Sequence, residues 1–297
     1  MKLQEALREI QSLRKKVRFL TREIESIKAA SIDDPSPVDK MLKMRGIKVF
    51  RKNPTDRLFF PPDISPFYAT RFYEMMKKYS FRLVLRDMIK YQDRFRIQDL
   101  TRYCSSKVVQ GYCDLLFKMG VITKNGRGRY RTHVSPLYSF GPTLEWFIAE
   151  LFKREFSSPA IYGVSVKKTP SGGDYDVIAS WNQRLVYVEV KSSPPKGVEQ
   201  NEISTFFSRI DDILPDAAVL FNDTQLRMKD KLVVMFEEEL ARRYGKESKT
   251  LYPVERLIGE LFHVENHIFL VNSRKDVVEN FQICLKHYLR STKNPKS

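Results

Sequence analysis

Three residues in the second half of the chain have the side chains and spacing needed for metal-assisted chemistry on a phosphate. In the run VYVEVKS, strand alternation places Glu189 and Lys191 on one face and valines on the other. Asp176 lies in the run DYDVIAS, which a tight turn joins to that strand, so its carboxylate can lie beside Glu189. Two close carboxylates repel each other unless a cation lies between them. The spacing therefore predicts a divalent-cation site.

The ligand types indicate which ion this site would take. Ligation by oxygen alone favours Mg²⁺ or Mn²⁺ over zinc. Such an ion would polarise a phosphate and activate a water molecule. The Lys191 ammonium would orient that water or stabilise developing negative charge. A plainer interpretation remains open: Glu189 and Lys191 could be an exposed pair on a half-buried strand, and Asp174 and Asp176 could simply hydrate a turn.

The surrounding segments predict an α/β domain that would hold these residues. An amphipathic helix is predicted over residues 141–156, with Leu144, Phe147 and Leu151 on its apolar face. Three strand-like runs follow, separated by the turns SGGD and WNQR. A helix over 202–214, strands over 217–222 and 268–272, and a last helix over 276–290 complete the order. Helix, antiparallel strands, helix and strand form an α/β arrangement with a mixed sheet.

This segment resembles the PD-(D/E)XK nuclease superfamily, which has the restriction-endonuclease-like fold. The residues that carry the resemblance are GGDYDVIA, with Asp176, and VEVKS, with Glu189 and Lys191. The resemblance covers about residues 141–222, plus the last strand and helix. It implies a nuclease-like domain over residues 137–292, in which the metal ion serves phosphodiester hydrolysis.

The resemblance also assigns roles to neighbouring residues. Val190 joins Asp176 and Glu189 as an implied metal ligand. Glu145, in the helix before the strands, matches a carboxylate that is often found there in this superfamily, and we expect it to be catalytic; a surface role for it stays open. Gln200 is a weaker candidate for which we favour a structural role, and Asp174 is expected to be peripheral.

A second module is predicted upstream, over residues 65–136. Three helical segments are followed by two strands that flank the turn signal NGRG. This order, with the ending LLFKMGVI of the third helix, resembles a winged helix-turn-helix domain, in which the third helix enters the major groove and the hairpin contacts the backbone or the minor groove. The expected DNA contacts are Lys107 and Gln110 on the third helix and Lys124, Arg127, Arg129 and Arg131 on the hairpin. Winged helices also mediate protein contacts, which is the alternative.

The first 30 residues carry the clearest periodic pattern. Apolar residues recur in steps of three and four from Leu3 to Ile27, as in the seam of a coiled coil. Such a narrow apolar stripe predicts a coiled-coil helix over residues 1–30 and a homodimer formed through it. The alternative is one amphipathic helix packed on its own domain. Residues 31–64 are rich in turn-forming residues and predict a linker, with a short strand around residues 47–50.

Composition limits the classes of partner. The chain has 297 residues and a formal net charge of +16, which favours polyanions and above all nucleic acid as the partner. No run approaches the roughly 18 to 20 apolar residues that span a bilayer, and the start has no signal-peptide core, so we expect a cytoplasmic protein without membrane contact. The three cysteines, Cys104, Cys113 and Cys284, lack CxxC spacing and predict free thiols.

Together these features predict a Mg²⁺-dependent DNA endonuclease that acts as a dimer and is positioned on duplex DNA by the winged helix. The alternative from another class is a non-catalytic DNA-binding regulator or assembly factor on a nuclease-like scaffold. The presence of Asp176, Glu189 and Lys191 together favours the nuclease. A nuclease for RNA ranks lower, because the chain lacks a clear RNA-binding signature.

Overall fold

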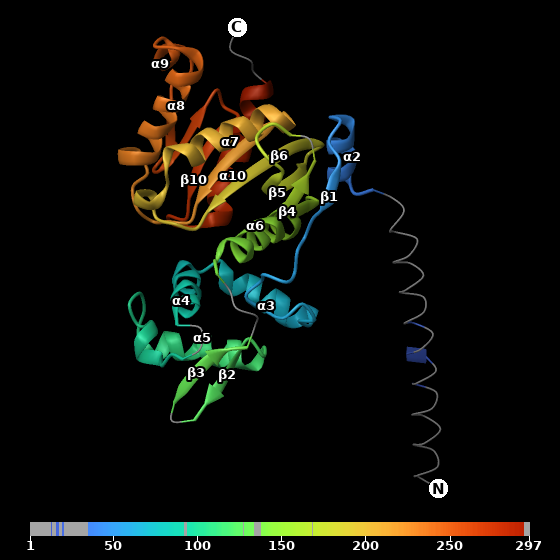
Figure 1. Cartoon of the computed structure of the whole chain (residues 1–297), viewed down its shortest axis with the longest axis vertical. Coiled ribbons are helices and arrows are strands. Elements are labelled where there is room, and N and C mark those ends of the chain that lie inside the picture. The colour runs from blue at the N-terminus through green and yellow to red at the C-terminus, as the bar shows by residue number, and fades with distance from the viewer. Residues whose placement is uncertain are drawn as a thin grey trace.

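The computed structural model describes residues 35–91, 94–126, 128–133, 138–167 and 169–293, together with Leu13, Lys16, Val17 and Leu20. Residues 37–51 and 141–293 form a mixed α/β unit around one large sheet, which we call the sheet lobe (Figure 1). Residues 66–132 form a smaller helix-hairpin lobe next to it.

The sheet has eight strands in the order β1-β4-β5-β6-β7-β10-β9-β8. They are β1 (Val49–Arg51), β4 (Ala160–Val166), β5 (Asp174–Trp181), β6 (Arg184–Lys191), β7 (Ala217–Asn222), β8 (Glu255–Ile258), β9 (Leu261–Val264) and β10 (Ile268–Asn272). Strands β6, β7 and β10 are parallel, and all other neighbours are antiparallel. The three parallel strands all finish at the same end of the sheet. Their last residues are Lys191, Asn222 and Asn272.

Helices cover both faces of this sheet. On one face lie α6 (Gly141–Glu155) and α10 (Val277–Lys293), and on the other lie α7 (Gln200–Ile213) and α8 (Val234–Tyr244). Strand alternation divides the core between them: Val186 and Val188 belong to the first cluster, Leu185 and Tyr187 to the second. The shorter elements are a 3-10 turn (Pro195–Gly197), a π-helical turn (Lys229–Val233) and α9 (Ser248–Leu251).

These elements confirm the predicted mixed α/β organisation of the second half of the chain. The helix expected over 141–156, the three strands after it and the last helix all form. Strands β8 and β9 and helix α8 were not predicted. Their sequence patterns are short or weakly periodic, and the strands exist through pairing with each other and with β10.

The helix-hairpin lobe contains α3 (Pro66–Met76), α4 (Tyr79–Lys90), a 3-10 helix (Ile97–Leu100), α5 (Ser106–Lys118), β2 (Ile122–Asn125) and β3 (Arg129–Thr132). Local sequence explains where α3 begins. The Ser65 hydroxyl accepts the Tyr68 amide at the start of α3, where Pro66 occupies the first turn. Phe95 and Tyr130 exchange backbone hydrogen bonds of 2.9 and 2.8 Å, which join the segment after α4 to the hairpin. The three helical segments and the two strands that the sequence predicted around the NGRG turn are present.

A buried ion pair joins the two lobes. The Nη2 atom of Arg82, in α4, lies 2.8 Å from Oδ1 of Asp223, which directly follows β7, and both side chains are fully buried. Arg86 and the Ser273 hydroxyl also bind the Asp223 carboxylate. The Asp223 amide donates to the Lys191 carbonyl at 2.8 Å. The helix-hairpin lobe is thus attached to the end of the sheet at which strand β6 finishes.

The segment expected to be a linker over residues 31–64 is partly structured. Residues 37–44 form α2 (Pro37–Met44), and β1 pairs antiparallel with β4 at the edge of the sheet. Val38 and Leu42 of α2 are fully buried in the core on the α7 side. The expectation of a linker therefore does not hold for residues 37–44, because Val38 and Leu42 are buried against a sheet that lies far away in the sequence, and the short strand expected around residues 47–50 forms as β1.

The coiled coil predicted over residues 1–30 lies almost entirely outside the described residues. Of that segment only Leu13, Lys16, Val17 and Leu20 are described; they are helical and exposed. Within the described chain, no helix is both long enough and apolar enough to cross a bilayer.

Candidate active site

The turn before β5 depends on a close approach of two backbones. The Gly173 carbonyl accepts the Val166 amide at 2.7 Å. A Cβ atom at Gly173 would lie only 2.2 Å from the Val166 carbonyl oxygen, so no other residue fits there without moving the backbone. The Gly-Gly lead-in seen in the sequence therefore fixes where β5 begins and how Asp174 and Asp176 are presented.

Asp176 lies where the pairing between β5 and β6 gives way to a side-chain contact. The last backbone pair of the two strands is Val177 with Val188. Beyond it, the Val190 amide donates to Oδ2 of Asp176 at 2.7 Å. This bond holds the Asp176 carboxylate between the ends of two strands. The structure thus brings Asp176 next to the segment of Glu189, Val190 and Lys191, as the sequence predicted.

Glu189 is surrounded by cations and a hydroxyl. Its side chain is 3% exposed. One carboxylate oxygen accepts from Arg209 of α7 at 2.6 Å and from the Tyr187 hydroxyl, and the other lies 3.0 Å from Lys191 Nζ. Tyr187, Glu189 and Lys191 share one face of β6, as alternation required, and it is the face that α7 covers. The interpretation of Glu189 and Lys191 as a merely exposed pair is wrong, because both are largely buried.

Lys191 binds two carboxylates. Its Nζ atom lies 3.0 Å from Glu189 and 2.8 Å from Glu202 of α7. Burial alone would lower the pKa of Lys191, but Glu189 and Glu202 outweigh it and raise that pKa above the usual lysine value. Lys191 therefore carries its proton at neutral pH and can act as a cation and hydrogen-bond donor, not as a base.

Glu145, on α6, lies close enough to Glu189 and Arg209 for their charges to change its pKa. A Cβ atom built at Gly163 of β4 would lie 3.7 Å from Oε2 of Glu145 and 2.7 Å from the Pro54 ring, so this glycine permits α6, β4 and the segment after β1 to meet. Burial and the Glu189 charge raise the pKa of Glu145 to about 7, although Arg209 opposes the rise. Its surroundings thus favour the neutral acid unless a cation is added.

Replacing Glu145 with glutamine is expected to flatten the pH dependence of stability. Between pH 4.5, the ordinary value, and about 7 the native carboxyl group holds more protons than the unfolded one. The free energy of unfolding therefore falls as pH rises through this window, and Glu145→Gln removes much of that fall. Urea unfolding from pH 4.5 to 8 measures it. Glu238→Gln, at an exposed position of α8, should keep the wild-type slope; equal slopes for all three proteins would contradict the assignment.

The residues that could hold a divalent ion are the carboxylates of Asp176, Glu189 and Glu145. Burial, Glu189 and Glu145 raise the pKa of Asp176 well above its usual range, although the Val190 amide opposes this. A bound cation would relieve the repulsion that the Glu189 charge exerts on ionised Asp176 and Glu145. The described residues contain no group of three His, Cys, Asp or Glu side chains spaced to hold a metal ion. Mg²⁺ commonly takes one or two carboxylates and completes its shell with water and substrate phosphate, which this site can accommodate.

Arg209 and Glu202 are site residues that sequence reasoning missed. Arg209 binds Glu189, and its guanidinium lies 5.7 Å from the centre of the Tyr175 ring. Arg209 lies seven residues after Glu202, two turns along α7, so both present to the same face. The seven-residue spacing of Glu202 and Arg209 is the sequence feature from which their shared helix face could have been predicted.

The two minor candidates lie around the site. Gln200 donates to the Met235 carbonyl at 3.0 Å and links α7 to the start of α8, which agrees with a structural role. Asp174 is exposed and accepts from the Ser165 hydroxyl at 2.7 Å. It is peripheral, although its charge still contributes to the raised pKa of Glu145.

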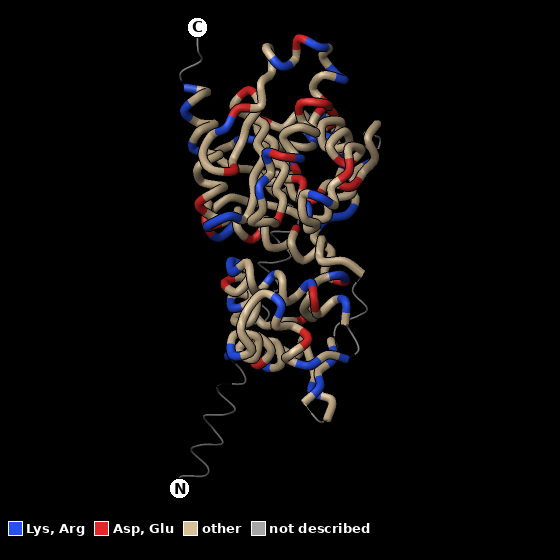
Figure 2. Tube along the Cα trace, turned by 90° about the vertical axis from the view of Figure 1, so that its left-hand side faces the viewer, with Lys and Arg blue, Asp and Glu red and all other residues tan. Residues whose placement is uncertain are grey.

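The basic residues predicted to contact DNA lie on the helix-hairpin lobe. Lys107 is exposed on α5, and Gln110 is held by Asp114 at 2.8 Å. Lys124 lies over the Phe117 ring, 5.4 Å from its centre. Arg131 donates to the Thr123 hydroxyl at 3.3 Å, and Arg127 lies outside the described residues. Figure 2 shows Lys and Arg distributed over much of this lobe.

Arg129 lines a cavity with two arginines that the sequence did not single out. The cavity, of about 350 Å³, is lined by Arg94, Phe95, Arg96, Asp99 and Arg129. Arg94 and Arg96 flank Phe95, whose backbone pairing with Tyr130 brings them to the base of the hairpin. Three guanidiniums against one carboxylate make this cavity suited to an anion.

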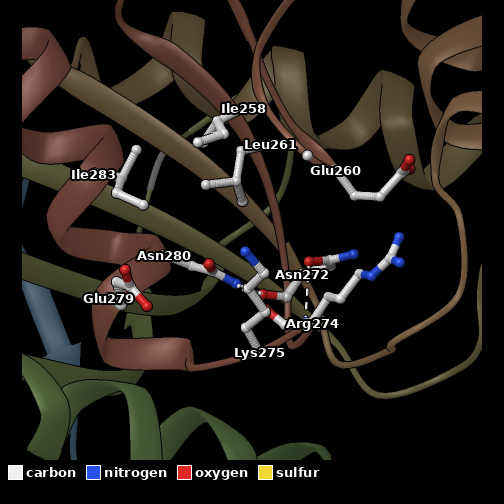
Figure 3. Close-up of a pocket in the computed structure, with 10 residues that line it drawn as sticks. Ile258, Glu260, Leu261, Asn272, Arg274, Lys275, Glu279, Asn280 and Ile283 are labelled. Atoms are coloured by element: carbon white, nitrogen blue, oxygen red, sulfur yellow. Dashed lines mark hydrogen bonds between the residues drawn. The ribbon is translucent and has the colours of Figure 1, made fainter.

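A different cavity, of about 250 Å³, lies where β10 leads into α10 (Figure 3). Ile258, Leu261 and Ile283 form its apolar side. Asn280 closes the turn there by donating to the carbonyls of Asn272 and Arg274 at 2.7 and 2.9 Å. None of the 10 residues that line it belongs to the predicted site.

Comparison with known proteins does not extend these observations. No family model matches the chain, and no curated protein matches its sequence. Two solved structures are similar in fold. Protein VC1899 from Vibrio cholerae has 12% identity and a TM-score of 0.46, and Can2 from Sulfobacillus thermosulfidooxidans, in complex with cyclic tetra-adenylate, has 11% identity and a TM-score of 0.48. Each alignment covers 85% of this chain and 60% of the other, and likeness at this level assigns no function.

Proposed function

We propose that the protein is a metal-dependent nuclease of the PD-(D/E)XK type that cuts DNA. One observation carries the proposal: Asp176 and Glu145 are desolvated carboxyl groups next to Glu189, and a protonated Lys191 lies beside them at the end of β6. Burying such a set of acids is costly, and binding a metal ion beside a phosphate accounts for it.

The residues would divide the work as follows. Asp176, Glu189 and the backbone of Val190 would hold Mg²⁺ or Mn²⁺, with Glu145 close to them. The bound ion would supply Lewis-acid polarisation of the phosphate and an activated water. Lys191 carries a positive charge that can stabilise the charge developing on the phosphate or orient the water. Arg209 holds the Glu189 carboxylate at 2.6 Å and limits repulsion among the acids.

We infer that the helix-hairpin lobe is a winged helix that positions DNA, within a module spanning about residues 65–136. The order of α4, the Phe95 bridge, the 3-10 helix, α5 and the hairpin supports this inference. The exposed Lys107 of α5 and the arginine cavity around Arg129 supply cations for phosphates. The buried contact of Arg82 with Asp223 would keep this module at a set position relative to the site.

The nuclease proposal is tested by incubating the purified protein with supercoiled plasmid, linear duplex and branched DNA. Parallel reactions contain Mg²⁺, Mn²⁺ or EDTA. We expect cutting that depends on the metal ion, that Asp176→Ala abolishes and that Lys191→Ala slows strongly. DNA that is bound but remains intact in every reaction would refute the nuclease and favour a non-catalytic DNA-binding regulator or assembly factor.

The apolar seam of residues 1–30 supports a homodimer. Deleting these residues is expected to convert a dimer into a monomer in sedimentation equilibrium, because the deletion removes the helix that would pair. The control is the double change Leu13→Asp and Leu20→Asp in the full chain, which should have the same effect without shortening the protein. A wild-type monomer would contradict the prediction.

A further inference from the structure

A basic strip with an exposed aromatic ring lies along the edge of the sheet near the candidate site. We call Lys48, Phe50, Arg51, Lys52 and Lys167 the β1 strip. All five are exposed. They lie on β1, directly beside it or just after β4, the strand with which β1 pairs (Figure 1). The strip was not anticipated from the sequence, which suggested a linker with only a short strand here.

Strand register places the β1 strip at the same end of the sheet as Asp176. Val49 of β1 pairs with Val166, and the next residue of β4, Ser165, pairs with Asp174 of β5. Asp176 follows two residues later on β5. Strands β1 and β5 are separated only by β4, which makes their spacing about 10 Å. The β1 strip and Asp176 therefore lie at the same end of the sheet, two strands apart.

The charge of this region is strongly positive. A cavity of about 730 Å³ beside β1 is lined by Lys43, Lys48 and Lys52, and Asp39 is the one acid among the described residues that line it. Asp39 pairs with Lys52, and Asp56 pairs with Arg51 at 3.2 Å. Among the described residues, Lys48 and Lys167 have no ion-pair partner. Within the β1 strip, these two lysines are thus the cations available for phosphate groups.

Phe50 gives the strip a feature that phosphate binding alone does not need. Its side chain is 58% exposed. The Lys167 Nζ atom lies 5.4 Å from the centre of its ring, a contact that still leaves most of the side chain open. Exposed apolar residues on an edge strand promote aggregation and are usually avoided. An aromatic ring flanked by lysines is the combination by which proteins bind single-stranded nucleic acid, with bases stacking on the ring.

We propose that the β1 strip binds an unpaired strand of DNA next to the scissile phosphate, with a base stacked on Phe50 and phosphates bound by Lys48 and Lys167. This inference rests on the proposed nuclease function and names its substrate class. The substrate is DNA with an unpaired stretch at the cleavage point, such as a branch or a flap, and not a continuous duplex. Stacking is insensitive to base identity, so recognition at this position is of structure and not of sequence.

Binding of a fluorescent single-stranded oligonucleotide, followed by anisotropy in EDTA, tests the strip without cleavage. Phe50→Ala is expected to weaken binding by about 5- to 150-fold, and Phe50→Trp to retain it. Affinity for a blunt duplex of the same length should stay within about twofold. Ile258→Ala is the matched control, because Ile258 is an apolar residue, 55% exposed, on the opposite edge strand β8; it should change neither affinity.

The lysines are tested through the salt dependence of the same binding. Lys48→Ala with Lys167→Ala should lower the slope of log affinity against log salt concentration by about 1.4, because each phosphate contact on a single strand contributes about 0.7. Lys249→Ala, an exposed lysine of α9, is the control. Circular dichroism melts show whether each variant is folded, and Phe50→Trp supplies the comparison if Phe50→Ala is not.

The outcomes separate this inference from the nuclease proposal. If Phe50→Ala binds single strands as tightly as the wild type, or loses duplex and single-strand affinity equally, the β1 strip does not bind an unpaired strand. If the wild type cuts no DNA but Phe50→Ala still selectively loses single-strand affinity, the strip is upheld and the nuclease proposal fails. If the wild type cuts continuous duplex as fast as flap DNA, the assignment of substrate class is overturned.

Discussion

Lys191→Ala is expected to slow metal-dependent DNA cleavage by roughly 100- to 1,000-fold, the usual effect of removing one positioned electrostatic group from a reaction centre. Lys191 is protonated, lies 3.0 Å from Glu189 and follows Val190, whose amide binds Asp176, at the end of β6. Its loss removes a positive charge from the phosphate while the backbone of β6 stays paired on both sides. The measurement is the initial rate of cleavage of branched or flap DNA at saturating Mg²⁺.

Asp176→Asn tests the carboxylate that would hold the metal ion. The amide oxygen can still accept the Val190 amide, as the carboxylate does at 2.7 Å, so the strand ends should keep their arrangement. The variant loses the charge that would hold the ion, and we expect cleavage to fall to the level seen in EDTA. Mn²⁺ binding, measured by calorimetry, should be lost in parallel. Because burial raises the pKa of Asp176, the melting temperature without metal should not decrease.

Two matched variants show whether these effects are specific. Asp174→Asn changes the exposed acid two residues before Asp176 on the same strand, and Lys249→Ala removes a lysine on α9. Both should cut at close to the wild-type rate. Cleavage that survives Lys191→Ala and Asp176→Asn undiminished would mean that the chemistry occurs elsewhere in the chain or belongs to a contaminant.

Arg82→Met is expected to lower the free energy of unfolding by about 3 to 5 kcal/mol, the usual cost of breaking a buried ion pair by removing one partner. Arg82 and Asp223 are both fully buried, and Arg82 donates to Oδ1 of Asp223 at 3.0 and 2.8 Å through two nitrogens. It also donates to the carbonyls of Met76 and Lys77. The substitution therefore leaves a carboxylate and two backbone acceptors without the Arg82 donor in a largely buried interface.

Urea unfolding measures this loss, and a surface pair calibrates it. Arg227→Met breaks the pair with Asp230, whose atoms lie 3.5 Å apart and whose side chains are 63% and 65% exposed. That change should cost less than about 1 kcal/mol. If Arg82→Met costs no more than Arg227→Met, the interface between the lobes does not depend on this pair.

The same pair predicts how stability responds to acid. Burial alone would raise the pKa of Asp223, but Arg82 and Arg86 outweigh it and hold that pKa below the ordinary value of 3.8. A depressed native pKa means that the pair stabilises the fold fully above the ordinary value, and that the contribution is lost as pH falls through the lower native value. The difference in stability between wild type and Arg82→Met should therefore shrink at low pH.

The amino-acid order alone was enough to locate the candidate site. Alternation along VYVEVK required Glu189 and Lys191 to share a face, and the short turn required Asp176 to lie next to them. The helix over 141–156 and the hairpin around NGRG could also be predicted from the sequence. These features depend on local periodicity and turn chemistry, which a single sequence displays directly.

Contacts between distant segments were decided only by the tertiary structure. Arg209 reaches Glu189 because α7 packs on one particular face of the sheet, and Arg82 reaches Asp223 across 141 residues of sequence. The sequence predicted a short strand around residues 47–50, but only the tertiary structure showed that it pairs with β4 at one edge of the sheet and that Phe50 contacts Lys167. No local pattern marks such partners, because an isolated arginine or a three-residue strand gains its role from the element that folds against it.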